Sequence, residues 1–406
     1  MITMTKTNEL IESKVDKKAV RKELIEAKKL YKSKKFQNAL DIYELNFSRN
    51  PEIFNKWDKI FYSWTIYQLN IKSSQDETQL FESADLITEL IPQADLNNSP
   101  VCAYTLSVFK VLNYLKDRED WEYMLYWLDK LNPVLLDEKQ GKSEDRLFPS
   151  NREKYFNLSS KALLECRDYE ECIEISKKAL DSLTNFTNNS DVWYNWRIAK
   201  SLKELNQNDD ALIYLKEVSK VKHDWFVSKE IAENYYILGD SESAKEYITN
   251  AVLTNDPSKI KVNLYYLAYK ILKDDDHDLA LKHAELFTAL KLESDAQLPE
   301  DIEDLLIDEE NLNVNDLEDE IKRYWSDFKY KDQELQSGTI TKVFDHKKSG
   351  FITSLNDESL YFNAFEFKDS KQLMKVGQLV TFYTQKSFDK SKNRQSVNAV
   401  NIHVGD

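Results

Sequence analysis

The sequence predicts a mostly helical chain that ends in a small β-domain, and three observations support this fold class. Only two of the six glycines, Gly141 and Gly239, precede residue 338. All seven prolines and all eight tryptophans also precede it. Because glycine weakens a helix interior, a stretch this long with so few glycines is typical of helical structure. After residue 338, short β-branched and aromatic runs replace the helical pattern.

The composition is that of a soluble protein with more than one domain. The chain has 406 residues, of which 41% are hydrophobic and 31% are charged. Residues 1–19 form a polar segment without the apolar core of a signal peptide, and no apolar run reaches the roughly 20 residues that span a bilayer. The three cysteines (Cys102, Cys166 and Cys172) form no CxxC motif. We therefore expect reduced thiols, a cytoplasmic location and no membrane contact.

The charge changes sign at the same boundary. Residues 336–406 contain ten basic and seven acidic side chains, a net charge of +3. The chain as a whole carries −15, so the preceding residues carry −18. This asymmetry is typical of a protein-binding scaffold joined to a nucleic-acid-binding module.

Residues 20–295 repeat a pattern of small side chains. Ala27 and Ala39 lie twelve residues apart, and the same spacing recurs along the chain. The other pairs are Ser160 and Cys172, Ala199 and Ala211, Ala232 and Ala244, and Ala268 and Ala280. Small residues let two antiparallel helices approach closely, while larger residues such as Leu30, Phe36 and Tyr43 fill the space between them.

This pattern resembles the tetratricopeptide repeat, a helix–turn–helix unit of 34 residues. Ala199 and Ala232 are 33 residues apart, and Ala232 and Ala268 are 36 apart. The match weakens between residues 52 and 135, where the units are longer. We expect about seven repeats, stacked into an α-solenoid (superhelix) with a concave groove.

The resemblance implies that the groove holds a protein or peptide partner, on residues of the first helix of each repeat. Carried over position by position, these residues are Lys28, Lys161, Trp196, Arg197, Lys200, Tyr236, Tyr265 and Tyr269. The alternative interpretation is that they are solvated lysines and aromatic residues that pack between repeats.

Residues 296–335 are predicted to form an acidic linker followed by a capping helix. Ile321, Tyr324, Trp325 and Phe328 make one apolar stripe on a helix that begins at Asn315 or Asp316. This stripe would cover the open apolar face of the last repeat. Docking to a partner is the alternative.

Residues 336–406 are predicted to form a closed five-stranded barrel, because closure removes exposed strand edges. The strand-like runs are residues 338–344, 350–354, 360–365, 379–388 and 396–404. "GFI" at 350–352, "LYFNAF" at 360–365 and "KVGQLVTF" at 375–382 resemble a cold-shock domain, a barrel of the oligonucleotide-binding type.

That resemblance implies binding of single-stranded RNA or DNA by aromatic stacking, with lysines neutralising phosphates. Phe351 and Tyr361 occupy stacking positions, and Lys347 and Lys348 form the basic turn. The candidate residues are Lys342, Phe344, Lys347, Lys348, Phe351, Tyr361 and Asn363.

Four positions depart from the cold-shock pattern. Ser349 and Ala364 replace aromatic residues, Lys342 replaces a tryptophan and Asn363 replaces a histidine. Phe344 and Phe365 lie one position away and would compensate only with a changed local geometry. Weak, salt-sensitive binding is therefore expected.

No catalytic motif is present. The five histidines form no metal-binding pattern, and the glycine-rich loops that cradle phosphates are missing. The sequence predicts a non-enzymatic adaptor without cofactor or metal. Two alternatives stay open: a protein–protein scaffold whose barrel no longer binds nucleic acid, and a peptide-sensing regulator.

Overall fold

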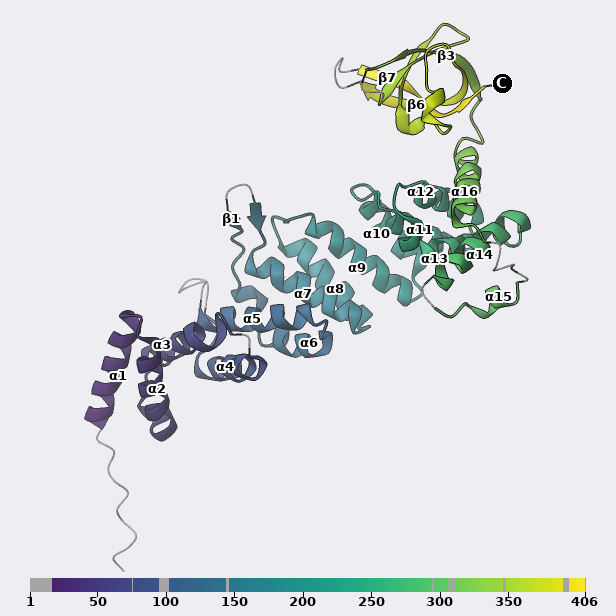
Figure 1. Ribbon diagram of the computed structural model, residues 1–406. Coiled ribbons are helices and arrows are strands. Elements are labelled where there is room, and N and C mark those ends of the chain that lie inside the picture. Colours follow the sequence, from purple (N-terminus) through teal and green to yellow (C-terminus); the bar gives the residue numbers. More distant parts are fainter. Residues whose placement is uncertain are drawn as a thin grey trace, which may run out of the picture. The chain divides into compact units, whose positions relative to one another are not determined.

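A computed structural model (Figure 1) describes residues 17–74, 76–94, 102–143, 146–293, 296–305, 307, 312–345, 348–389 and 394–405. Most of the predicted polar segment 1–19 lies outside these residues. The chain divides into two compact units, residues 1–221 and 222–406, which are described separately. The predicted fold class is confirmed, since a helical solenoid precedes a closed β-barrel.

The first unit consists of helices that contact one another in sequential pairs. These helices are α1 (Lys17–Lys32), α2 (Phe36–Arg49), α3 (Lys56–Ile66), α4 (Glu77–Leu90), α5 (Ala103–Asp117), α6 (Trp121–Asp129), α7 (Asn151–Glu165), α8 (Tyr169–Ser182), α9 (Ser190–Glu204) and α10 (Asn208–Ser219). Helix α3 begins with a capping box between Asn55 and Asp58 and continues into a π-helical turn, Tyr67–Ile71. This turn lies where the repeat pattern weakens.

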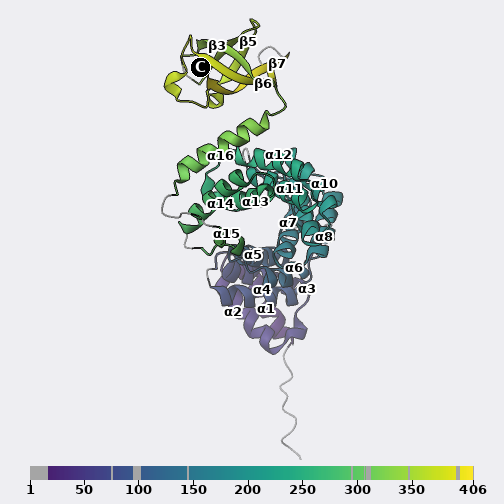
Figure 2. The same cartoon turned by 90° about the vertical axis from the view of Figure 1, so that its right-hand side faces the viewer.

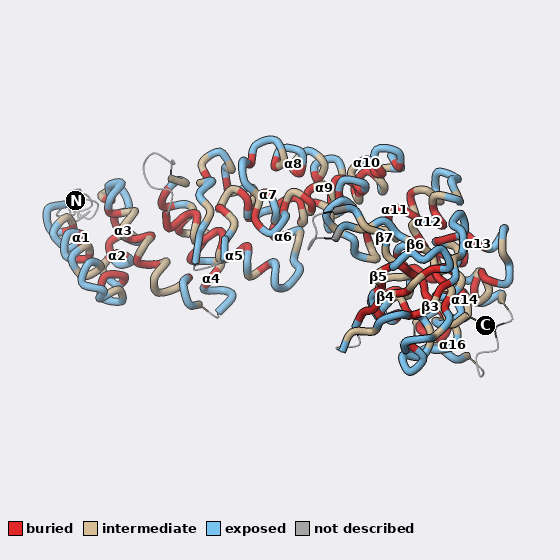
Figure 3. The backbone as a smooth tube through the Cα atoms, turned by 90° about the horizontal axis from the view of Figure 1, so that it is seen from above, coloured by how far each residue is buried: buried red, intermediate tan, exposed pale blue. Residues whose placement is uncertain are grey.

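The small residues of the repeat pattern lie where paired helices meet. Ala27 on α1 and Ala39 on α2 are both fully buried. Ser160 on α7 and Cys172 on α8 are also fully buried, and the Cys172 thiol donates to the Ser160 carbonyl at 3.2 Å. Buried residues line the facing sides of these helices (Figure 3).

A short hairpin between α6 and α7 was not predicted. Its strands are β1 (Gly141–Ser143) and β2 (Arg146–Phe148), and every residue in them is exposed. Three-residue strands without a buried face carry too little alternation for recognition in the sequence.

The second unit begins with two further helix pairs. These helices are α11 (Trp225–Ile237), α12 (Ser241–Val252), α13 (Val262–Leu272) and α14 (His277–Leu292). The paired residues Ala232 and Ala244, and Ala268 and Ala280, are buried, as in the first unit. Helix α15 (Glu300–Glu303) follows, and its Ile302 is buried in the same core. This part of the predicted linker is therefore packed against the repeats.

Helix α16 (Val314–Lys329) packs on α14 (Figure 2). It begins slightly earlier than predicted because the side chain of Asn313 accepts hydrogen bonds from the backbone of Asn315 and Asp316. Trp325 is fully buried, and its indole N–H donates to Nε2 of His283 at 3.0 Å. Nδ1 of His283 lies 2.8 Å from the Leu279 carbonyl, so the ring is held on both sides.

The barrel strands are β3 (Gln336–Val343), β4 (Ser349–Ser354), β5 (Ser359–Asn363), β6 (Leu379–Asp389) and β7 (Arg394–Val404). They close in the order β3-β4-β5-β7-β6, with β5 and β7 parallel and the other pairs antiparallel. The five predicted strands therefore all form.

Alternation places the apolar side chains inside the barrel. Ile340, Ile352, Phe362, Phe382 and Ala399 are all fully buried and form its core. A bulge between Ile340 and Lys342 shifts the register of β3 against β4. After this bulge, Lys342 lies opposite Phe351, and Val343 packs against the core.

Gly350 allows β3 and the ring of Phe362 to approach β4 closely. A Cβ at this position would lie 2.2 Å from the Lys342 carbonyl oxygen and 2.6 Å from Cε1 of Phe362. We expect Gly350→Ala to destabilise the barrel by about 2–3 kcal/mol, because backbone must move. Amide hydrogen exchange of β4 and β5, followed by mass spectrometry, would be faster by about 30-fold or more.

Gly141→Ala is the matched control. A Cβ there would lie 3.4 Å from its nearest neighbour, Cβ of Phe148, which it tolerates. Exchange in the barrel should match that of the unchanged chain. Unaltered protection of β4 in Gly350→Ala would contradict the predicted close approach.

Candidate functional site

Aromatic side chains gather on the outward face of β4 and β5. Phe351 and Tyr361 lie directly opposite each other, between inward-pointing residues of the two strands. Their ring centroids are 5.8 Å apart at an interplanar angle of 75°. Both side chains are half-buried, so each leaves part of its ring open to solvent.

Phe344 joins this pair from the turn after β3. Its backbone N–H donates to the Ser349 carbonyl at 3.1 Å, and its ring centroid lies 5.8 Å from that of Phe351. Nζ of Lys342 lies 4.9 Å from the centroid of the Phe344 ring. The bulge in β3 therefore assembles three rings, which we call the aromatic triad: Phe344, Phe351 and Tyr361.

Two of the three lysines predicted for this face belong to the described residues. Lys342 and Lys348 are exposed near the triad, whereas Lys347 lies outside the described residues. Lys371 is held nearby, since Nζ donates to the carbonyls of Ala364 and Phe367. Burial, with a smaller effect of neighbouring Lys368, lowers the pKa of Lys371.

Asn363 is exposed at the end of β5, but its side chain has a structural contact. Its Oδ1 accepts the backbone N–H of Phe365 at 3.1 Å and caps the 3-10 turn Ala364–Glu366. The amide oxygen therefore already has a partner. Phe365 itself is 77% exposed.

Two departures from the aromatic pattern fall at buried positions. Ser349 is 6% exposed and Ala364 is 8% exposed. A stacking ring needs an open face, so these positions are not missing platforms in this barrel.

Sequence reasoning missed two residues beside the triad. The parallel pairing of β5 with β7 places Asn398 opposite Tyr361, and Gln385 on β6 lies opposite Asn398. The period-2 pattern of each strand marks both residues as outward-facing, but only the strand order brings them beside Tyr361.

Three lysines predicted for the groove of the first unit lie over aromatic rings. Nζ of Lys28 is 4.6 Å from the centroid of Phe61, and Nζ of Lys161 is 4.6 Å from that of Trp121. Nζ of Lys200 is 6.0 Å from the Trp196 ring. All are half-buried, so they combine packing within the solenoid with partial exposure.

Arg197 is buried rather than open to a groove. Its guanidinium donates to Oδ1 of Asn157 at 2.7 Å and to Oγ of Ser160 at 3.2 Å. Burial lowers the pKa of the guanidinium. We therefore correct its assignment from a partner-binding residue to one that links α9 to α7.

The tyrosines predicted for the groove in the second unit are mostly core residues. Tyr265 is 1% exposed and donates to Oγ of Ser258 at 2.9 Å, and burial raises the pKa of its phenol to about 12. Tyr269 is also buried, with its hydroxyl donating to the Asp301 carbonyl. Only Tyr236 is half-buried at the surface. The structure therefore places Tyr265 and Tyr269 in the core, whereas the repeat pattern predicted them at the groove surface.

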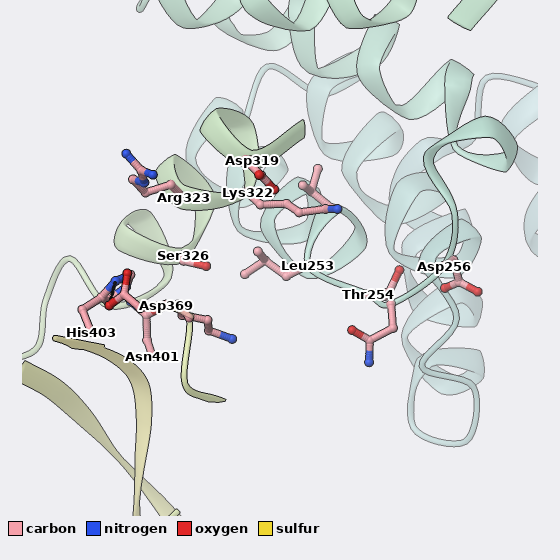
Figure 4. A pocket seen from close by; sticks show the side chains of 13 residues that line it. Leu253, Thr254, Asp256, Asp319, Lys322, Arg323, Ser326, Asp369, Asn401 and His403 are labelled. Atoms are coloured by element: carbon pink, nitrogen blue, oxygen red, sulfur yellow. Dashed lines mark ion pairs between the residues drawn. The ribbon is translucent and has the colours of Figure 1, made fainter. Parts of the chain in front are cut away.

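A polar cleft lies beside α16 (Figure 4). Its volume is about 740 Å³, and its walls come from the end of α12, from α16 and from the barrel. Lys322 and Arg323 face it from α16, and Asp369, Asn401 and His403 face it from the barrel. Both basic and acidic side chains line it, so it has no dominant charge to select a ligand.

Other kinds of site are absent from the described part of the chain. No group of three or more histidine, cysteine or acidic side chains there could hold a metal ion. None of the described helices is long and apolar enough to cross a membrane. Cys102 and Cys172 are buried free thiols, and Cys166 is a half-buried one.

Comparisons with known proteins show a similarity of fold alone. No protein-family model and no curated protein matches the chain. Among solved structures, apo RapI is similar at 15% identity over 76% of this chain and 86% of its own, with a TM-score of 0.41. YrrB, a TPR protein with an unusual peptide-binding site, is 13% identical over 52% of this chain and 90% of its own, with a TM-score of 0.34.

A third similar structure is the human IFIT1 dimer with PPP-AAAA. It is 14% identical over 77% of this chain and 65% of its own, with a TM-score of 0.35. These similarities concern the helical-repeat fold and carry no information on ligands.

Proposed function

We propose that this chain is a non-enzymatic adaptor whose barrel binds single-stranded nucleic acid, RNA above all, while its helical repeats hold a protein partner. The aromatic triad carries the nucleic-acid part of the proposal. Five-stranded barrels of the oligonucleotide-binding type bind on their second and third strands and the adjacent loops. Here those strands are β4 and β5, which carry Phe351 and Tyr361.

The aromatic triad offers stacking surfaces to the bases of a flexible single-stranded nucleic acid. Bases splay out from a single strand and stack on aromatic faces, and each stacked base contributes roughly 1–3 kcal/mol. The edge-to-face contacts hold the three rings at fixed angles, so little side-chain entropy is lost on binding. Lys342, whose ammonium lies over the Phe344 ring, and Lys348, which is exposed in the turn before β4, are the candidate contacts for phosphates.

The charge distribution favours a different partner for the repeats. Residues before the barrel carry a net −18, which repels a polyanion, whereas residues 336–406 carry +3. Lys28, Lys161 and Lys200 with their aromatic neighbours are the candidate contacts for a protein segment. The free thiols suit a reducing, cytoplasmic location.

Fluorescence anisotropy of a labelled eight-nucleotide RNA, titrated with the full chain, tests the barrel. With two described lysines near phosphates and a slope of about −0.7 per contact, affinity should fall about sevenfold between 50 and 200 mM salt. Matched single-stranded and double-stranded DNA are titrated in the same way, so that their affinities can be compared with that of the RNA. Absence of binding at 50 mM salt would refute nucleic-acid binding and favour the scaffold alternative.

Nuclease treatment separates the two parts of the proposal. A protein partner held by the repeats should stay bound after the nucleic acid is digested. If every associated protein is lost on digestion, the repeats do not hold a partner directly.

A further inference from the structure

An unbroken row of outward-facing side chains crosses all five strands of the barrel. Lys342 on β3 lies opposite Phe351 on β4, and Phe351 lies opposite Tyr361 on β5. Tyr361 then lies opposite Asn398 on β7, and Asn398 opposite Gln385 on β6. Residues paired across strands project to the same side of a sheet. The order along this row, around the outside of the barrel, is therefore lysine, two aromatics and two carboxamides.

Burial of the neighbouring residues agrees with this orientation. Ala399, next to Asn398, is fully buried in the barrel core, so Asn398 points outward. Asn398 is half-buried and Gln385 is exposed. Among the residues that the structure describes, neither carboxamide has a hydrogen-bond partner, so their donors and acceptors remain available to a ligand.

We infer that Asn398 and Gln385 read the edge of the base stacked on Tyr361, and that they favour adenine. This inference rests on the nucleic-acid binding proposed above. Stacking on a ring is tolerant of base identity, because every base has a π-face. Discrimination has to come from hydrogen bonds to base edges, and these two side chains are the amides in the same row as Tyr361.

The hydrogen-bonding groups of a carboxamide favour adenine. A carboxamide presents a donor and an acceptor side by side, in the spacing that pairs with N6 and N7 of adenine. Guanine presents two acceptors on the same edge and would leave the amide oxygen unpaired. On the corresponding edge, cytosine presents only its N4 donor and uracil only its O4 acceptor, so an amide makes one hydrogen bond to either of them.

The test compares oligo(A), oligo(U) and oligo(C) eight-mers by anisotropy with the full chain at 50 mM salt. Oligo(A) should bind about tenfold more tightly than the pyrimidine strands, since a bidentate amide–base pair gives discrimination of this order. Asn398→Ala with Gln385→Ala should reduce oligo(A) binding to the level of the others. Binding of oligo(U) should change less than twofold.

Asn398→Asp provides a second variant of nearly equal size. It replaces the amide donor with an acceptor, which repels adenine N7 and accepts from the N4 amino group of cytosine. The ratio of oligo(A) to oligo(C) affinity should therefore fall. Gln395→Ala is the matched control, because Gln395 lies opposite Phe388, outside the row.

The possible outcomes distinguish base reading by the two amides from nucleic-acid binding by the barrel. If the unchanged chain binds all three strands equally, or the double variant weakens all of them alike, base reading by these amides is overturned while nucleic-acid binding stands. If the unchanged chain binds none of the three oligonucleotides, both base reading and nucleic-acid binding are refuted. A selective loss of oligo(A) affinity supports both.

Discussion

Replacing Phe351 and Tyr361 together with alanine is expected to weaken binding of a single-stranded eight-mer by about 30-fold or more. Each ring is a stacking platform, and two platforms at roughly 1–3 kcal/mol each make a large share of a small module's affinity. Loss of Phe351 also removes the ring that Phe344 and Tyr361 both contact. The affinity is measured by fluorescence anisotropy at low salt. The lysines contribute most to binding there, so a loss of affinity under these conditions is the strictest test of the two rings.

The matched control is Phe388→Ala. Phe388 is 49% exposed on β6 but lies opposite Gln395, so it takes no part in the triad. Its loss should leave the affinity within twofold. Hydrogen exchange of β4 and β5 should stay unchanged in the double variant if the barrel is intact. An unchanged affinity in an intact barrel would mean that the triad does not bind nucleic acid.

Acidification from pH 7 to pH 4 is expected to destabilise the second unit by about 3 kcal/mol through His283 alone. The ring is fully buried, and burial lowers the pKa of this histidine to about 4, against weaker opposite effects of the Leu279 carbonyl and Asp276. The unfolded chain takes up a proton near pH 6.5, which the folded chain excludes until about pH 4. Stability present above pH 6.5 is therefore lost as the pH falls through that window.

The comparison with His283→Gln isolates this contribution. Glutamine can still accept the indole N–H of Trp325 but does not titrate. The difference in urea unfolding free energy between the unchanged chain and the variant should shrink by about 3 kcal/mol between pH 7 and pH 4. His277→Gln, at an exposed site on the same helix, is the matched control for the substitution itself. A pH-independent difference for His283→Gln would rule out a neutral, buried imidazole.

The elements of this fold were predictable because each depends on a local pattern. Alanine pairs twelve residues apart mark helices that touch, since only small residues fit between them. The glycine-rich, β-branched tail marks strands by the same kind of local signal, and all five were found. The hairpin β1–β2 and the π-turn after α3 carry no such pattern and were missed.

The candidate site was less predictable because it depends on register and burial. Phe344 reaches Phe351 only because of the bulge in β3, and no periodicity in the sequence shows a bulge. Asn398 is 37 residues from Tyr361 and becomes its neighbour only through strand order. Tyr265 and Arg197 were assigned to a surface from the repeat pattern, but their hydrogen bonds hold them in the interior.

The stacking of Tyr330 on Tyr383 has a consequence for the length of strand the barrel could hold. The two ring centroids are 4.8 Å apart at 12°, and Tyr330, just after α16, is buried. Tyr383 lies two residues before Gln385 on β6, so this outward face is already covered there. Along the curved surface of the barrel, the row from Lys342 to Gln385 spans four inter-strand steps, a path of about 19 Å. A footprint of about four nucleotides, the short end for such barrels, suits a loop or a frayed end better than a long continuous strand.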